Sequence, residues 1–139
     1  MKFVNSTEMK INLTKEQEGH LCSKEYIKKI AKKRNIVSYD IYDNDTIIGF
    51  AQLRKYKRNC YFLWNFAIDI EYQNKHFGIR ALKELLVLLK KEYKVKEVVT
   101  TYTFGNEHAK HVYETVGFVE TDVIDEDGVH EVNMVYKYE

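Results

Sequence analysis

The segment from Tyr72 to Leu82 holds the residues whose types and spacing are best suited to chemistry. It follows the apolar run Tyr61–Ile68 and opens a long amphipathic segment that ends near Tyr93. A strand therefore leads through a short polar turn into the start of a helix. The unpaired backbone N–H groups of a helix start, together with the positive end of the helix dipole, form a site for a phosphorylated ligand. Gly78 lies where a side chain would obstruct the approach of that ligand to the backbone.

Composition and charge narrow the class of protein. The 139 residues are the length of one domain, which we take to span 1–139. Twenty-two Lys and Arg against 21 Asp and Glu give a net charge of +1, which provides no electrostatic case for nucleic acid or a membrane as the main partner. Cys22 and Cys60 have neither the number nor the spacing of a disulfide framework or a metal site, so no metal is expected. No apolar run approaches the ~20 residues that cross a bilayer. Met1–Leu13 lacks the apolar core of a signal peptide, so we expect a cytoplasmic protein.

The N-terminal third is predicted to be a short strand followed by a broken helix. Met9–Leu13 alternates between apolar and polar residues, as a short strand does. Thr14, with Gln17 three residues later, has the pattern of a helix cap, and residues 15–33 then favour helix. A break near residues 19–23 is expected to divide this helix, with Ser23 capping its second piece.

The middle of the chain is predicted to form three antiparallel strands. Residues 37–42 and 47–53 are strand-like around an Asp-Asn-Asp turn, which indicates a hairpin. Residues 54–59 are expected to form a basic turn, and the apolar stretch 60–70 a further strand.

The C-terminal half alternates helices with strands. Residues 78–91 have leucines at helical spacing, 97–102 are β-branched, and 106–115 favour a short helix that ends at Gly117. Residues 118–124 and 129–138 predict a closing hairpin. Hairpins combined with crossover helices imply an α/β protein with a mixed, mostly antiparallel sheet of about six or seven strands and about four flanking helices.

Two motifs on these elements resemble those of the GNAT family of N-acetyltransferases. Gln73–Gly78 is similar to the family's pyrophosphate-binding signature Gln/Arg-x-x-Gly-x-Gly/Ala, with His76 in place of the first glycine. Only a backbone N–H is expected to be required at that position. Asn106–Phe118 is similar to a second family pattern, Asn-x-x-Ala-x-x-x-Tyr-x-x-x-Gly-Phe, at every fixed position. The motifs occur in the family's order, and the resemblance covers about residues 9–138.

The resemblance implies the acyl-CoA N-acyltransferase fold and transfer of an acetyl group from acetyl-CoA to a primary amine. The cofactor's diphosphate would lie on the backbone N–H groups of residues 74–79. Lys75 and Arg80 would either add charge or remain solvated. The pantetheine arm would hydrogen-bond along the strand 66–68, where this strand diverges from 96–102, and an N–H near Ile68 would stabilise the oxyanion. The expected cofactor-binding residues are Phe66, Ala67, Ile68, Gln73, Asn74, Lys75, His76, Phe77, Gly78, Ile79, Arg80, Asn106 and Tyr113.

Tyr113 is the expected general acid that protonates the departing thiolate. A phenol has a pKa of about 10 and a thiol one of about 8.5, so a tyrosine stays protonated at neutral pH. The alternative for Tyr113 is a packed helix tyrosine. Asn106 would contact the pantetheine or cap its own helix.

The base that deprotonates the incoming amine is left open by the sequence. Glu16 and Glu18 lie on the first helix, which borders the acceptor site in this family, and they are the predicted substrate-binding residues. The other candidates for the base are His108, His111, His130 and Asp69. A water chain to solvent would also serve.

The segments 13–18 and 125–132 resemble those of bacterial spermine and spermidine acetyltransferases, which makes a polyamine the expected acceptor. Carboxylates near the thioester would bind such a polycation. Two features differ from that expectation: Trp64-Asn65 precedes the oxyanion strand, and the segment 24–34 is basic. An aminoglycoside, an amino acid, a protein N-terminus or a protein lysine are the other acceptors considered.

Functions outside catalysis are also open. A non-catalytic acyl-CoA sensor on the same fold is the second hypothesis. A nucleic-acid binder using the basic runs 24–34 and 54–58 is the third, and the near-zero net charge disfavours it. A homodimer is expected through an apolar edge on the final strand.

Overall fold

The computed structural model describes residues 1–139 as seven strands, four α-helices and one short 3₁₀ helix. The strands form one sheet in the order β1-β2-β3-β4-β5-β7-β6, in which only β4 and β5 run parallel. This confirms the predicted mixed, mostly antiparallel sheet. The elements are β1 (Lys2–Asn5), α1 (Lys15–His20), α2 (Lys24–Ile30), β2 (Ile36–Asp43), β3 (Thr46–Lys57), β4 (Cys60–Ile68), η1 (Ile70–Tyr72), α3 (Phe77–Tyr93), β5 (Glu97–Thr103), α4 (Glu107–Val116), β6 (Val119–Glu126) and β7 (Val129–Lys137).

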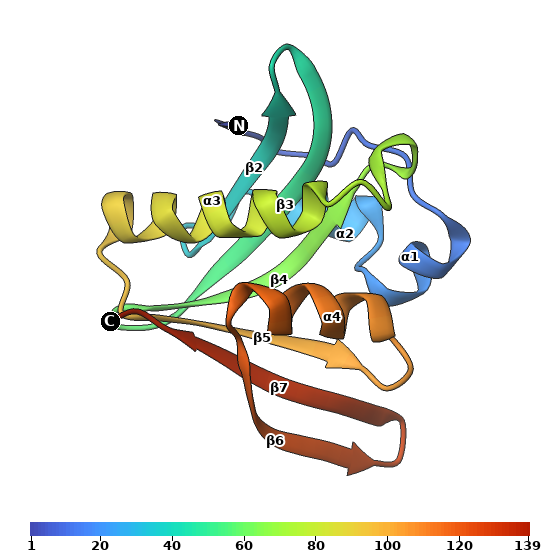
Figure 1. Ribbon diagram of the computed structural model, residues 1–139, viewed down its shortest axis with the longest axis vertical. Helices are drawn as coiled ribbons and strands as arrows, with labels where there is room; N and C mark the ends of the chain where they lie inside the picture. The colour runs from blue at the N-terminus through green and yellow to red at the C-terminus, as the bar shows by residue number, and fades with distance from the viewer.

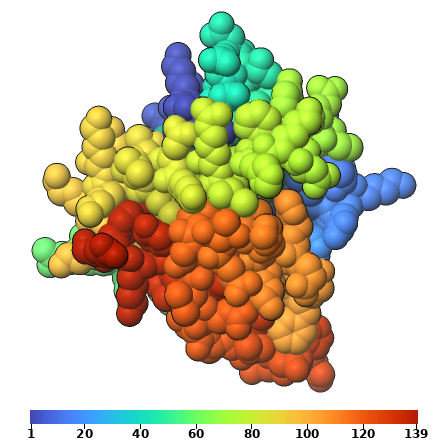
Figure 2. Space-filling model, viewed as in Figure 1, coloured from blue at the N-terminus to red at the C-terminus, as the bar shows by residue number.

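The sheet is covered on both faces. Figure 1 shows α3 and α4 on the near side and α1 and α2 on the other. Leu82, Leu85 and Leu89 of α3 lie in the main core, which confirms the predicted apolar face. A second, smaller core beneath α2 contains Ile27 and Phe50. In the space-filling view, residues of α3 lie above those of α4, and α1 lies at the right-hand edge (Figure 2).

The first strand is not where the sequence predicts it. Residues 9–13 have no regular secondary structure and pair with no strand, and β1 lies earlier in the chain, where Lys2 pairs with Tyr42 of β2. Met9 and Ile11 are buried in the second core, so their alternation with polar residues reflects burial of an extended segment. Hydrogen bonds from its side chains and backbone, including Lys10 Nζ to Asp40 Oδ2 at 2.6 Å, hold the segment in place.

The predicted break between the first two helices is confirmed. Thr14 and Gln17 form a reciprocal capping box at the start of α1, and Ser23 caps α2 by accepting from the Tyr26 N–H. The predicted basic turn at 54–59 is wrong, because β3 continues to Lys57 and only Arg58 and Asn59 form the turn. No helix of the protein is long and apolar enough to cross a membrane.

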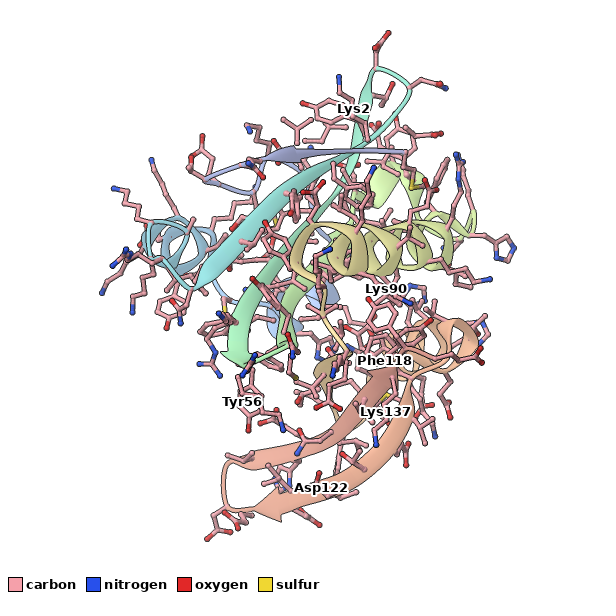
Figure 3. The ribbon with its side chains drawn as sticks, turned by 90° about the vertical axis from the view of Figure 1, so that its left-hand side faces the viewer. Lys2, Tyr56, Lys90, Phe118, Asp122 and Lys137 are labelled. Carbon is pink, nitrogen blue, oxygen red and sulfur yellow. The ribbon has the colours of Figure 1, made fainter.

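The final strand is not an edge of the sheet. β7 lies between β5 and β6, so β6 is the edge, and most of its residues are exposed. Figure 3 shows Asp122 of β6 and Lys2 of β1 at opposite ends of the molecule, as expected for residues on the two outer strands. The apolar edge from which a homodimer was predicted is therefore covered within the chain itself.

A β-bulge in β4 separates that strand from β5. Asn65 pairs with Gln52 and Leu63 with Leu53, which leaves Trp64 as an extra residue without a partner in β3. Bulges bend a strand and increase its twist. The parallel ladder to β5 ends at the pair Leu63–Thr100, although both strands continue beyond it. In Figure 1 the two strands lie together near the C-terminus and diverge toward α1, as the resemblance to the GNAT family implies.

Candidate active site

A groove of about 610 Å³ occupies the region where β4 and β5 diverge. Residues of β4, β5, α1, α4 and the start of α3 line it, so segments far apart in the chain meet there. The predicted site residues that line it are Glu16, Phe66, Ala67, Ile68, Gln73, Asn74, Gly78, Asn106, His108 and Tyr113. Those that do not are Glu18, Lys75, His76, Phe77, Ile79, Arg80, His111, His130 and Asp69.

The backbone at the start of α3 is shaped by two residues in the left-handed region. Asn74 has φ of 61° and His76 has φ of 64°, and His76 is the N-cap without a side-chain hydrogen bond to the helix. His76 therefore adopts the conformation for which the family motif has glycine, at a cost of about 1 kcal/mol. The expectation that only an N–H is needed at position 76 is thus incomplete, because the turn also requires a positive φ. The first helical N–H groups have no side-chain cap.

The packing of the protein does not itself require glycine at position 78. A Cβ atom added at Gly78 would lie 3.6 Å from Ile68 Cγ1 and 3.9 Å from Val112 Cγ2. Both are ordinary van der Waals distances, so the fold itself has room for a methyl group. Because Gly78 lines the groove, that methyl group would displace a ligand instead.

The carbonyl at the end of β4 is held by two glutamine side chains. Gln73 Nε2 donates to the Ile68 oxygen at 3.1 Å, and Gln17 Nε2 of α1 donates to the same oxygen at 3.0 Å. The motif residue Gln73 therefore ties the turn to the strand that it follows. The sequence indicated Gln17 only as a capping residue and gave no signal for this second contact.

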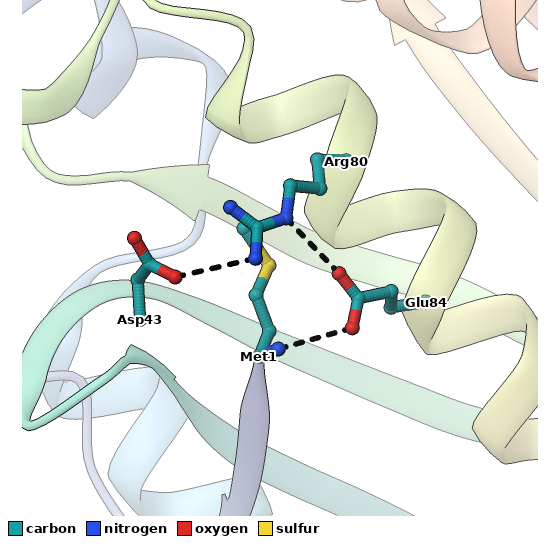
Figure 4. Close-up of polar contacts among 4 residues, drawn as sticks. All are labelled: Met1, Asp43, Arg80 and Glu84. Atoms are coloured by element: carbon teal, nitrogen blue, oxygen red, sulfur yellow. Dashed lines mark hydrogen bonds and ion pairs between the residues drawn. The ribbon is translucent and has the colours of Figure 1, made fainter.

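Arg80 faces away from the groove. Its guanidinium lies 3.4 Å from the Asp43 carboxylate and 3.3 Å from that of Glu84, and Glu84 also pairs with the N-terminal amine of Met1 (Figure 4). In this conformation Arg80 joins α3 to the β2–β3 hairpin. Arg80 and the groove-lining residues lie on different sides of α3.

Tyr113 is buried and lines the groove from α4. Burial raises the pKa of its phenol above the ordinary value of 10, and the nearby Thr100 side chain opposes the shift more weakly. The phenol is therefore a protonated acid at neutral pH. Its ring packs against Phe118, with 5.5 Å between ring centres, so the residue is both packed and accessible from the groove. Asn106 caps α4 by accepting from the Ala109 N–H, and it also lines the groove.

The end of the groove next to α1 contains side chains that are not among the site residues predicted from the sequence. His20, Trp64, Thr103 and Glu131 all line it. His20 Nδ1 lies 2.7 Å from Thr103 Oγ1. These residues come from α1, β4, β5 and β7, and no local motif marks them.

A network of buried side-chain hydrogen bonds holds the α1 end of the groove in place. Asn65 Oδ1 accepts from the Cys22 N–H at 3.0 Å, and Asn65 Nδ2 donates to Gln52 Oε1 at 3.0 Å. Gln52 Nε2 in turn donates to the Ile27 carbonyl and to Ser38 Oγ. The loop between α1 and α2 is therefore anchored to the centre of the sheet.

Two of the other candidates for the base have structural partners outside the groove. Asp69 accepts from the backbone N–H groups of Asn12 and Glu71, and His130 Nδ1 lies 2.7 Å from Asp125 Oδ1. No group of three or more His, Cys, Asp or Glu side chains is arranged to hold a metal ion.

Comparison with known proteins identifies the family of this chain. The profile of the acetyltransferase (GNAT) family matches residues 7–118. The chain therefore belongs to the GNAT family, whose members are acetyl-CoA-dependent N-acetyltransferases. A search of curated protein sequences gives no significant match.

The fold is shared with solved structures at low identity. One is a spermidine N-acetyltransferase from Vibrio cholerae in complex with CoA and spermine, with 19% identity, 81% of this chain and 72% of that chain covered, and a TM-score of 0.68. Another is an aminoglycoside acetyltransferase in complex with coenzyme A, with 18% identity, the same two coverages and a TM-score of 0.69. A dodecameric form of the Vibrio cholerae enzyme matches with 19% identity, 82% and 71% coverage and a TM-score of 0.66.

Proposed function

We propose that this protein transfers the acetyl group of acetyl-CoA to a primary amine of a polycation, with a polyamine such as spermidine or spermine as the acceptor. The charge of the groove carries this proposal. Its 25 lining residues include the carboxylates Glu16 and Glu131 but no Lys or Arg, in a chain that has 22 of these cations. At the end of the groove next to α1, these two carboxylates would attract a multiply charged amine and repel an anionic acceptor.

The basic residues of α2 do not oppose this acceptor, because none of them lines the groove. Lys24 Nζ donates to the Ile11 carbonyl and Lys28 lies 3.7 Å from Glu8, so both are engaged elsewhere. The basic segment 24–34, which differs from what a polyamine acceptor would favour, therefore lies outside the proposed acceptor site.

The cofactor is proposed to bind at the end of the groove formed by β4 and α3. Its diphosphate would accept hydrogen bonds from the backbone N–H groups of residues 74–79, at the uncapped start of α3. The pantetheine arm would add to β4 along residues 66–68, where β5 no longer pairs with it. An N–H near Ile68 would stabilise the oxyanion, a contribution of about 2.7–4 kcal/mol in comparable sites.

Tyr113 is proposed to protonate the thiolate that leaves. The amine attacks the thioester carbon, the C–S bond breaks, and the phenol supplies the proton that makes coenzyme A a thiol. Because burial raises the pKa of Tyr113, the proton is present when the thiolate forms. A second candidate, an aminoglycoside acceptor, is favoured by the same charge and by the aminoglycoside acetyltransferase among the similar structures.

The release of coenzyme A from acetyl-CoA, measured with a panel of amines, tests the acceptor. Spermidine and spermine should give the highest kcat/KM, ahead of an aminoglycoside, a free amino acid and a lysine peptide. If an aminoglycoside ranks first, the second candidate replaces the first. If no amine reacts although acetyl-CoA binds, the protein is a sensor rather than an enzyme.

Cellular location and assembly stay predictions. Cytoplasmic location is tested by fractionation of the cells that make the protein. The predicted homodimer would have a solution mass of twice 16.6 kDa. The apolar edge from which it was predicted is covered by β6. A mass of 16.6 kDa alone would reject the homodimer.

A further inference from the structure

We propose that His20 is the base that removes the proton from the acceptor ammonium, with Thr103 as the positioning residue for its ring; this rests on the proposed N-acetyltransferase function. His20 is the last residue of α1 and Thr103 the last residue of β5, and both line the groove. Their 2.7 Å contact joins the two sides of the acceptor end. An ammonium has no lone pair, so it must lose a proton at this end of the groove before it can be acetylated.

The Thr103 contact defines which nitrogen of His20 can act. If Nδ1–H donates to Thr103 Oγ1, Nε2 keeps its lone pair and can accept the proton. Histidine is the side chain whose charge ordinarily changes between pH 5 and 8, so an imidazole can serve as a base at neutral pH. The hydrogen bond also fixes the orientation of the ring, as the partners of catalytic histidines do.

The carboxylates of the groove lie on either side of this pair. Glu16 precedes His20 by four residues on α1, so the two side chains lie on the same helix face. Glu131 of β7 is directly opposite Thr103 in the antiparallel register. A cationic amine held by these two carboxylates is placed beside the imidazole. The other titratable groups of this groove are Cys22, Tyr102, His108 and Tyr113.

The remaining histidines are less suited to this role. His108 lines the groove, but no hydrogen bond fixes its ring. His130 is held by Asp125, and neither His130 nor His111 reaches the groove. His20 is therefore the one histidine of the groove whose ring has a hydrogen-bond partner.

The protons balance with one base and one acid. The ammonium gives a proton to Nε2 of His20, which passes it to water, and the free amine attacks the thioester carbon. The C–N bond forms and the C–S bond breaks; the nitrogen loses a second proton to solvent, while Tyr113 protonates the sulfur and regains its proton from solvent. The products are the acetamide, the thiol of coenzyme A and one proton released.

Kinetics of the full chain with spermidine test the proposal. His20→Gln should lower kcat by about 10²- to 10⁴-fold. It should also change the shape of the acidic limb of the pH profile, because the rate then follows the fraction of free amine alone, and it should leave the Kd of acetyl-CoA unchanged. Raising the pH should partly restore this variant, because more of the amine is then free. His111→Gln, an exposed histidine on α4, is the matched control and should behave as wild type.

A His20→Gln protein with the wild-type kcat and an unchanged acidic limb would overturn the proposal, as would the larger fall in kcat in His108→Gln instead. A second arm needs no acceptor: ¹⁵N spectra of the histidine rings in the protein alone. The expected result is protonated Nδ1 on His20 at neutral pH, altered by Thr103→Val. A ring protonated on Nε2 alone overturns the proposal, whereas failure of spermidine as an acceptor with the expected tautomer rejects only the proposed acceptor.

Discussion

The two ends of the groove are built in different ways. At the proposed cofactor end, the main chain would do the binding, through a turn with positive φ at Asn74 and His76, an uncapped helix start and residues 66–68 of β4, which have no partner on the β5 side. At the acceptor end, side chains such as His20 and Glu131 from separate elements form the wall. The first end is local in sequence, and the second requires the whole sheet to be assembled.

This difference separates a cofactor site that relies on the main chain from an acceptor site that relies on particular side chains. Backbone amides bind any phosphorylated cofactor of the right shape, so a motif of a few residues is enough to specify them. An acceptor is selected by the charge and shape of its site. Side chains such as Glu16 and Glu131 set these properties, and they can be exchanged without altering the turn before α3. Variants at the two ends should therefore have separable effects.

The largest effect is expected where the two ends meet, at Tyr113. Tyr113→Phe should lower kcat by about 10²-fold or more, because it removes the acid and keeps the ring that packs on Phe118. The Kd of acetyl-CoA should be unchanged. Equal turnover in the variant would mean that water protonates the thiolate.

The pH dependence of the wild type provides a further check on Tyr113. Its raised pKa moves the loss of the phenolic proton to higher pH, so kcat should not fall on the alkaline side before about pH 10. A fall in kcat well below that pH, absent from Tyr113→Phe, would contradict the burial argument.

Gly78→Ala should affect the cofactor end alone. The added methyl group fits the protein but intrudes on the groove, so the Kd of acetyl-CoA should rise by about 10- to 100-fold, the loss of one or two hydrogen bonds to a charged group. The free energy of unfolding should not decrease, since alanine favours helix over glycine. Calorimetry and thermal unfolding measure the two quantities. Unchanged acetyl-CoA binding would place the diphosphate elsewhere.

Removing one groove carboxylate should affect the acceptor end alone. Glu16→Gln or Glu131→Gln should raise the KM of spermidine about two- to fivefold, the size of one partly exposed charge pair. Glu18→Gln is the matched control, because Glu18 lies on the same helix and does not line the groove. Steady-state kinetics at low ionic strength measure the difference. If Glu18→Gln has the largest effect, the acceptor lies outside the groove.

The smallest effect is expected at His76. His76→Gly removes the strain of a left-handed residue but adds entropy to the unfolded chain, so the free energy of unfolding should change by no more than about 1 kcal/mol. The Kd of acetyl-CoA should stay the same. A large loss of acetyl-CoA binding would mean that the imidazole itself contacts the cofactor.

The turn and helix start at residues 73–78 could be predicted from the sequence because their signals are local. Gln73–Gly78 follows an apolar strand and opens an amphipathic helix, and both features are visible in the chain as periodicity. The sequence did not predict the positive φ of His76, because histidine rarely adopts it. It also missed β1, since the alternation at Met9 and Ile11 is the same for a buried extended segment as for a strand.

The acceptor end could not be predicted in this way. Glu131 lies opposite Thr103 because β7 inserts between β5 and β6, and His20 meets Thr103 across 83 residues of sequence. That strand order depends on tertiary packing, which single-sequence patterns do not encode. Glu18 was predicted together with Glu16 because both lie on α1, but only one face of the helix reaches the groove.

Amide spectra of the protein with and without coenzyme A test the central claim most directly. The account predicts the largest shifts at the N–H groups of residues 66–68 and 74–79, with smaller shifts at Asn106 and Tyr113. Shifts confined to another surface, such as the face around Lys83, Lys90 and Tyr138, would contradict it.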